Sequence, residues 1–360
     1  MSPAVVTVIP VVLVGVMKWL MPSLVPPTIP FGVRVPRDRA DAPVVVAQRR
    51  RYRAVTGVVA VLAVAGTLLA GRPWAGLAVV GVELAVGVFC YLYARRRIAE
   101  VKAAEHWFGG RRQVVVADTS LRTEPERYPW PWAVPAVVLA LATVIIGIVA
   151  YPDMPARLAM HFGPAGRPDR YAAKSFVSAF GPVVTQVAST ILLLAVAGAA
   201  LHSRAQLDAE DPQAAPRHRQ FVAATTRALL VLAACTGVTF LFGSLANWQL
   251  ISPPASVVTA LNVVPGVLGA AAVLVVAIRF GQGGSRLRLA GSAAGRARTV
   301  NREDDRLYRL GIFYYNPDDP AMLVPKRFGI GWTLNMARPA TWVIFGLLLV
   351  MALIGVLAGR

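Results

Sequence analysis

The residues with the widest chemical range lie in one short stretch, Met160–Ser175, with the sequence MHFGPAGRPDRYAAKS. It contains His161 and Asp169, and a second carboxylate, Asp153, precedes it. A histidine near a carboxylate can bind a metal ion, respond to pH or contact a peptide. One histidine and two carboxylates fall short of the three protein ligands usual in catalytic zinc sites, so we predict no metal site. The Gly and Pro residues favour tight turns, and a rigid turn-rich hairpin is the alternative to a recognition loop.

A second candidate group lies inside apolar segments. Glu83 stands within VVGVELAVGVFC, and two neutral polar residues, Gln186 and Asn262, lie at comparable depth in other apolar runs. An ionised carboxylate in hydrocarbon is costly, so it faces protein or water and marks a functional candidate. The three side chains could form a hydrogen-bonded clamp between helices or line a proton or ion route. We favour the clamp, because a single acid with no basic partner at its depth makes a poor proton relay. Lys18 lies nearer the inner face and is expected to extend toward the headgroups.

The composition indicates that membrane helices position these residues. The 360 residues are 56% hydrophobic and only 15% charged, whereas soluble domains carry about 25% charged residues. The formal net charge is +19, but the basic residues lie in loops between apolar runs and form no continuous stripe. We therefore expect anionic lipid headgroups, and no nucleic acid, as the partner of this charge.

Eight apolar stretches are near the length of about 20 residues that a helix needs to cross a bilayer. The sequence therefore predicts an all-α fold, a polytopic transmembrane helical bundle with about eight spans, or seven if the first does not cross. The predicted spans are 4–21, 55–70, 74–93, 132–150, 177–201, 221–243, 256–278 and 341–357.

The distribution of Lys and Arg predicts the orientation, because loops rich in these residues stay in the cytoplasm. With both termini outside, 29 of the 37 basic residues fall in inner loops. The Met160–Ser175 stretch is then external and carries the only external histidine. The inner segment contains Asn-Pro-Asp-Asp-Pro at 316–320, for which we predict a turn held by side chain to backbone bonds and no calcium loop. Its aromatic and basic residues suggest a flap against the inner headgroup layer.

The external stretch also resembles a known family. YPDMPARLAMHFGPAGRPDRYAAKS, followed by a span that contains proline, resembles the domain-of-unknown-function family 1648, which also occurs in SdpI-type bacterial toxin-immunity proteins. Gly163 stands where that family often has Asn. GIFYYNPDDPAMLVPKRFGIGWTLN, at 311–335, resembles the domain-of-unknown-function family 5808. The first resemblance is carried by Pro152, Asp153, Pro155, His161, Phe162, Gly166, Pro168, Asp169, Tyr171 and Lys174.

The resemblance implies a non-enzymatic protein of the bacterial cytoplasmic membrane with an SdpI-like toxin-immunity or envelope-sensing role. No catalytic motif and no cofactor motif is found, and the expected partners are an extracellular peptide and a cytoplasmic protein. The alternative is an ion-coupled small-solute transporter that uses Glu83. The candidate recognition residues are His161, Phe162, Asp169, Tyr171 and Lys174.

We divide the chain into five parts. Residues 1–130 hold three spans and basic loops, and residues 131–201 form a hairpin of two spans with the external loop 151–176. Residues 202–280 hold two further spans, residues 281–340 form a basic cytoplasmic segment, and residues 341–360 form the last span.

Overall fold

The computed structural model describes residues 3–70, 73–114, 126–162, 167–203, 205, 207, 213–287, 299–301 and 303–358. Within these residues the fold consists of eight long α-helices and short two-stranded sheets. The helices are α1 (Pro3–Leu24), α2 (Pro43–Ala70), α3 (Pro73–Ala104), α5 (Trp130–Ala150), α6 (Phe176–Leu201), α7 (Ala214–Asn247), α8 (Ala255–Phe280) and α9 (Pro339–Ala358).

The helices confirm the predicted fold class of a helical membrane bundle. Each of the eight predicted spans coincides with one long helix. In the described part of the chain, six helices are long and apolar enough to cross a membrane, namely α2, α3, α5, α6, α7 and α8, and α1 contains a shorter apolar stretch, Val8–Leu24. α2, α3 and α7 extend beyond the predicted spans at the same end of the bundle, so they carry basic residues out of the apolar layer.

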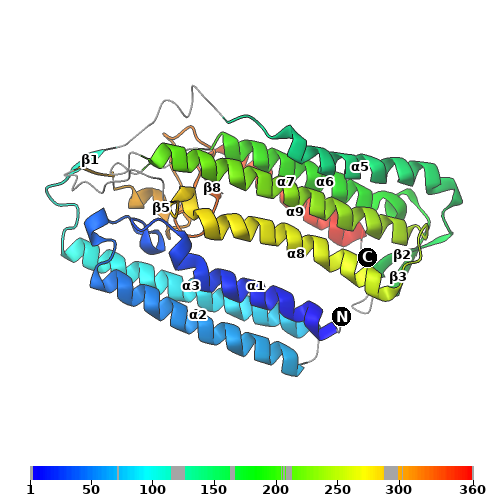
Figure 1. The fold of residues 1–360 in the computed structure, drawn as a ribbon, viewed down its shortest axis with the longest axis horizontal. Helices are drawn as coiled ribbons and strands as arrows, with labels where there is room; N and C mark the ends of the chain where they lie inside the picture. Colours follow the sequence, from blue (N-terminus) through cyan, green and yellow to red (C-terminus); the bar gives the residue numbers. More distant parts are fainter. Residues whose placement is uncertain are drawn as a thin grey trace.

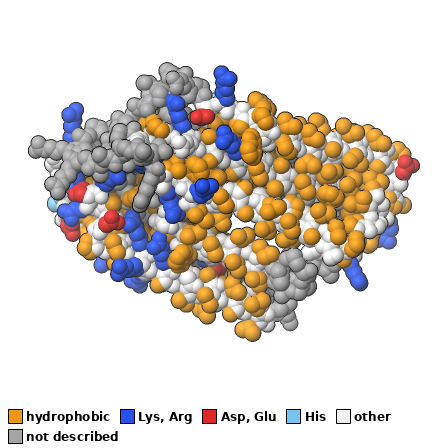
Figure 2. Space-filling view, in the orientation of Figure 1, with side chains coloured by type: hydrophobic (Ala, Val, Ile, Leu, Met, Phe, Trp, Pro, Cys, Tyr) orange, Lys and Arg blue, Asp and Glu red, His pale blue; other side chains and the backbone are white. Residues whose placement is uncertain are grey.

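The helices lie roughly parallel to one another in two groups (Figure 1). α1, α2 and α3 pack together, α5, α6, α7 and α8 form the second group, and α1 and α8 make contact between the groups. Both termini lie at the same end as β2 and β3, as the predicted orientation requires (Figure 1). We call this the outer end and the opposite end the inner end. Figure 2 shows most of the visible Lys and Arg side chains gathered toward the inner end, beside a broad apolar face.

The outer end carries an antiparallel hairpin of β2 (Arg157–Phe162) and β3 (Pro168–Ala173). Leu158 pairs with Ala172, and the register shifts on either side of His161. We predicted turns here but no strands. The sequence signal for strands was weak, because β3 has no alternation of buried and exposed residues and nearly all of it lies in solvent.

The inner end is built from short elements that connect the long helices. After α1 come the 3-10 turns η1 (Pro30–Gly32) and η2 (Arg37–Arg39), and α8 is followed by η4 (Gln282–Gly284). The segment 303–338, which we call the inner flap, contains η5 (Asp305–Leu307) and two hairpins. These are β5 (Tyr308–Arg309) with β6 (Phe313–Tyr314) and β7 (Leu323–Pro325) with β8 (Trp332–Leu334). A parallel pair, β1 (Arg112–Val114) and β4 (Thr299–Asn301), lies nearby (Figure 1).

The inner flap is a folded unit, whereas we expected a flap spread on the headgroup layer. The Phe328 side chain projects from the flap and packs between Phe31, Tyr52 and Tyr91. The centre of its ring lies 4.3 Å from that of Tyr91. The predicted turn at 316–320 is confirmed. The backbone N–H of Asp318 donates to the Asn316 side chain, 3.1 Å away.

Candidate functional site

The outer hairpin is fixed at its base and exposed on its outer face. Leu158 and Met154 are buried against Phe180 and Trp248 in one apolar cluster. The indole N–H of Trp248 donates to the carbonyl oxygen of Ala179 at 2.9 Å, which ties α7 to the start of α6 beneath the hairpin. The cluster therefore holds the strands in place without covering their solvent face.

Two of the predicted recognition residues meet on that face. The Nδ1 atom of His161 lies 2.6 Å from Oδ1 of Asp169, and the two side chains are 55% and 53% exposed. The carboxylate orients the imidazole and leaves Nε2 available to a partner. Among the described residues, Asp153 forms no ion pair with His161, so the histidine has one carboxylate neighbour rather than two.

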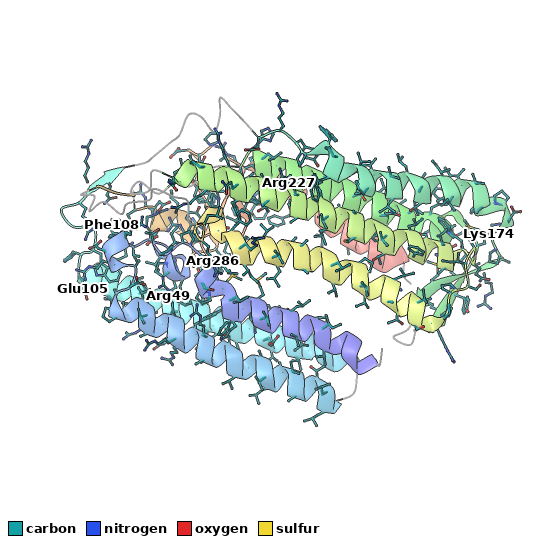
Figure 3. The ribbon with its side chains drawn as sticks, viewed as in Figure 1. Arg49, Glu105, Phe108, Lys174, Arg227 and Arg286 are labelled. Atoms are coloured by element: carbon teal, nitrogen blue, oxygen red, sulfur yellow. The ribbon has the colours of Figure 1, made fainter. Side chains whose placement is uncertain are left out.

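The other predicted recognition residues have different surroundings. Tyr171 is 46% exposed, and the Arg157 guanidinium lies 5.9 Å from the centre of its ring. Lys174 donates to the carbonyl oxygens of Pro152 and Met154, at 2.9 and 3.1 Å, and so secures the hairpin base (Figure 3). Phe162 belongs to β2, but its side chain lies outside the described residues.

The buried carboxylate of Glu83 has a basic partner that the sequence analysis missed. The Lys18 Nζ atom lies 3.6 Å from Oε1 of Glu83 and donates to the backbone carbonyl of the same residue at 2.7 Å. A Cβ built on Gly87 would lie 2.9 Å from Cδ of Lys18, so the lysine stem crosses α3 one turn from Glu83. Lys18 therefore points along α3 toward Glu83, and the expectation that it extends toward the inner headgroups was wrong.

The three intramembrane polar residues do not form a common clamp. The Gln186 amide lies 3.4 Å from the Gly237 carbonyl oxygen on α7, and the Asn262 amide donates to Val258 in its own helix at 2.9 Å. In the described part of the chain, no hydrogen bond joins Glu83, Gln186 and Asn262 to one another. Both carboxylate oxygens of Glu83 lack a hydrogen-bond partner there, because the contact with Lys18 is too long to be one.

A charge cluster at the inner end was not predicted. The Arg327 guanidinium, 0% exposed, contacts the carboxylates of both Asp304 and Asp305. The Arg34 Nε atom lies 2.7 Å from Asp304, and the Lys102 Nζ atom lies 2.6 Å from Asp305. The contacts of Arg34 and Lys102 join the inner flap to the chain after η1 and to α3. The sequence signal was the acidic run at 303–305, which stands out in a strongly basic segment.

The basic residues of this cluster keep its aspartates ionised. Burial alone would raise the pKa of the Asp304 carboxyl, but Arg34 and Arg327 outweigh burial and hold that pKa below its ordinary value. Burial acts on Asp305 in the same sense, and Arg327 and Lys102 lower its pKa in turn. The cluster is thus an ionic lock between parts of the chain far apart in sequence.

The described residues contain no group of three or more His, Cys, Asp and Glu side chains that could hold a metal ion. The site at the outer end is therefore a polar, partly aromatic surface on a fixed hairpin.

Two family models match the chain on the segments where the resemblances were seen. Residues 138–187 match the Domain of unknown function (DUF1648), and residues 317–342 match the Family of unknown function (DUF5808). No curated protein and no solved structure matches the chain significantly. The first segment comprises the outer hairpin with adjoining parts of α5 and α6, and the second comprises β7, β8 and the start of α9. The chain is thus a multi-pass helical membrane protein that carries a DUF1648 segment at its outer end and a DUF5808 segment at its inner end.

Proposed function

We propose that this chain is a non-enzymatic protein of the bacterial cytoplasmic membrane with an SdpI-like toxin-immunity or envelope-sensing role. In this proposal the outer hairpin contacts an extracellular peptide. The supporting observation is the exposed His161–Asp169 pair on a hairpin that the bundle holds in place. The pair lies inside the segment that matches DUF1648.

The hairpin offers two kinds of contact to a peptide. In the described part of the chain β2 and β3 form a two-stranded sheet, and open strand edges can pair with an added extended chain. The exposed Tyr171 ring and the imidazole of His161 would then contact side chains of the peptide. Backbone pairing would supply affinity, and the side chains would supply selectivity.

The test is protection of living cells. A strain that lacks this protein is complemented with the wild type, His161→Ala, Asp169→Asn or Arg167→Gln and exposed to a panel of membrane-active peptides. Arg167→Gln is the control, because it removes an exposed charge directly before β3 of the same hairpin but leaves the pair intact. We expect wild type and control to protect and the two pair variants to fail at equal membrane abundance. Equal protection by all four would refute the proposed role of the pair.

A second candidate function rests on the Lys18–Glu83 pair. A fully buried carboxylate with no hydrogen bond to either oxygen is a group that could exchange a proton during ion-coupled transport. The test is proton flux into proteoliposomes. Flux that is lost in Glu83→Gln and kept in His161→Ala would support transport, and the absence of proton flux with wild type would reject it.

For the inner end we propose two partners. The basic loops would contact anionic headgroups. The exposed rings of Phe313 and Tyr315, 46% and 42% exposed, would contact a cytoplasmic protein. Co-purification of such a protein by wild type but not by Phe313→Ser/Tyr315→Ser would support the second contact, and identical co-purification would reject it.

A further inference from the structure

A cavity of about 140 Å³ lies at the inner end, and neither family match assigns a role to it. Its wall comes from the chain on either side of η1, from the start of α7, from η4 and from the inner flap. Arg286, the neighbour of the wall residue Ser285, marks the region in Figure 3, between the inner ends of α8 and α1. The cavity therefore lies where the two helix groups and the flap meet.

The wall is held in shape by contacts of its own. The Gln282 side chain donates to the Gly331 carbonyl oxygen at 2.8 Å and accepts from the Gly331 N–H at 2.7 Å, which fastens η4 to the flap. Gly284 has a φ of +82°, and a Cβ there would lie 2.6 Å from the Arg217 carbonyl oxygen. Only glycine permits η4 to approach α7 this closely, so the cavity is a built feature of the fold.

Three buried or half-buried polar side chains in the wall keep unused hydrogen-bonding atoms. Arg34 is 3% exposed, and Asp304 engages its Nε atom, but among the described residues nothing bonds to its two Nη atoms. His218 is 7% exposed and has no hydrogen-bond partner in the same residues. The Ser285 hydroxyl is buried and lacks a partner as well. Buried polar groups are nearly always satisfied, so the Ser285 hydroxyl is expected to bond to a ligand or water.

The charge of the wall selects an anion. Arg34, Arg37 and Arg217 line the cavity, and none of its described wall residues is an acid. Ala214, the first residue of α7, also lies in the wall, so the positive end of that helix dipole adds to the field. Asp304 neutralises part of the Arg34 charge from behind. The arrangement leaves a donor-rich surface of net positive charge.

A phosphate group fits this surface in geometry and in size. The guanidinium group presents parallel N–H donors that match two phosphate oxygens, and imidazole and hydroxyl donors can reach a third. An engineered cavity of about 150 Å³ holds benzene, so the volume here admits a phosphate with part of what it is attached to. His218 lies three residues before the predicted span 221–243, or about 4.5 Å from the hydrocarbon at 1.5 Å per residue. This is the depth of the inner headgroups.

We propose that this cavity binds a phosphate group, with Arg34, Arg37, His218 and Ser285 as its donors. The group belongs either to an anionic phospholipid of the inner leaflet or to a free phosphorylated small molecule. The proposal is independent of the role of the outer hairpin.

The experiment uses the full chain, purified in neutral detergent and stripped of lipid. Isothermal titration calorimetry measures the binding of dihexanoyl-phosphatidylglycerol and of inorganic phosphate at constant ionic strength. The variants are Arg37→Gln, Ser285→Ala and Arg37→Gln/His218→Gln. Arg34 is left intact because it also holds the ionic lock. Arg96→Gln is the matched control, since it removes a charge that is 83% exposed on α3, outside the cavity.

We expect the double variant to bind at least about tenfold more weakly, as the loss of one charge-assisted hydrogen bond implies. Arg37→Gln and Ser285→Ala should show smaller losses, and Arg96→Gln should match the wild type. Binding of the lipid but not of phosphate identifies a headgroup site, and comparable binding of both identifies a site for free phosphorylated molecules. No binding of either probe, or an equal loss in Arg96→Gln, would overturn the proposal. Arg37→Gln and Ser285→Ala change partly exposed positions and keep the test valid if the double variant does not fold.

Discussion

Removal of the Arg327 side chain should destabilise the inner end of the protein. The guanidinium is completely buried and contacts Asp304 and Asp305. It also lies 4.2 Å from the centre of the Tyr308 ring. In Arg327→Met an unbranched apolar chain fills much of the space, so the main loss is the positive charge.

The size of the loss in stability depends on the basic partners that Asp304 and Asp305 keep in the variant. Removal of one partner of a buried ion pair costs about 3–5 kcal/mol, because the other charge stays buried and uncompensated. Arg34 still contacts Asp304, and Lys102 still contacts Asp305, so we expect the lower end of this range, about 3 kcal/mol. At about 2 °C per kcal/mol for a large domain, the thermal midpoint should fall by about 6 °C.

The assay is thermal unfolding of the full chain in detergent, followed by tryptophan fluorescence. Arg309→Met is the control, because Arg309 lies on the same flap but is exposed, and its contact with the Tyr315 ring at 5.0 Å is worth about 0.5–1 kcal/mol. Adding Asp304→Asn to Arg327→Met should raise the thermal midpoint again in part, since it removes one of the buried carboxylate charges that Arg327 had compensated. Equal midpoints for Arg327→Met and Arg309→Met would refute the reasoning.

Three further predictions follow from other contacts. Because the folded-state pKa values of Asp304 and Asp305 lie below the ordinary carboxyl value, the stability that they contribute is complete above about pH 4. It is lost as the pH falls through the lowered values, and limited proteolysis of the flap should increase only there. Lys18→Met should leave the buried Glu83 carboxylate without its basic partner and so reduce the yield of monodisperse protein in size-exclusion chromatography. The double variant Lys18→Met/Glu83→Leu should restore that yield. His161→Ala should change the free energy of unfolding by less than about 1 kcal/mol, because it removes an exposed pair, and thermal unfolding followed by tryptophan fluorescence measures the change.

The membrane helices were predictable from the sequence because the bilayer imposes a length and a composition on each span. All eight predicted spans coincide with helices. The ends of α3 and α7 were not predictable, because both helices continue into the inner polar region, where no hydrophobic signal marks a boundary. The sequence also predicted that the outer loop lies at the same end of the bundle as both termini. It left open whether Asp153 or Asp169 lies beside His161, and the two strands were not predicted.

The contacts between helices were harder to predict. The Lys18–Glu83 pair joins residues 65 positions apart, and depth estimates from helix ends placed the lysine too far from the carboxylate. Such estimates ignore the length and direction of the lysine side chain, which crosses Gly87 to reach Glu83. The link from Arg34 to Asp304 depends on how the flap folds onto the chain that follows η1, and no periodic pattern encodes that arrangement.

α7 connects the two candidate sites. Its inner end supplies His218 to the phosphate cavity, and Trp248, directly after its outer end, supports the hairpin. The helix has 34 residues, which corresponds to about 50 Å at 1.5 Å per residue, and no proline lies between Phe221 and Asn247 to bend it. A rigid helix of this kind transmits displacement along its axis. A displacement of the outer hairpin would therefore press first on Trp248, which lies directly after the helix that supplies His218 to the wall of the cavity.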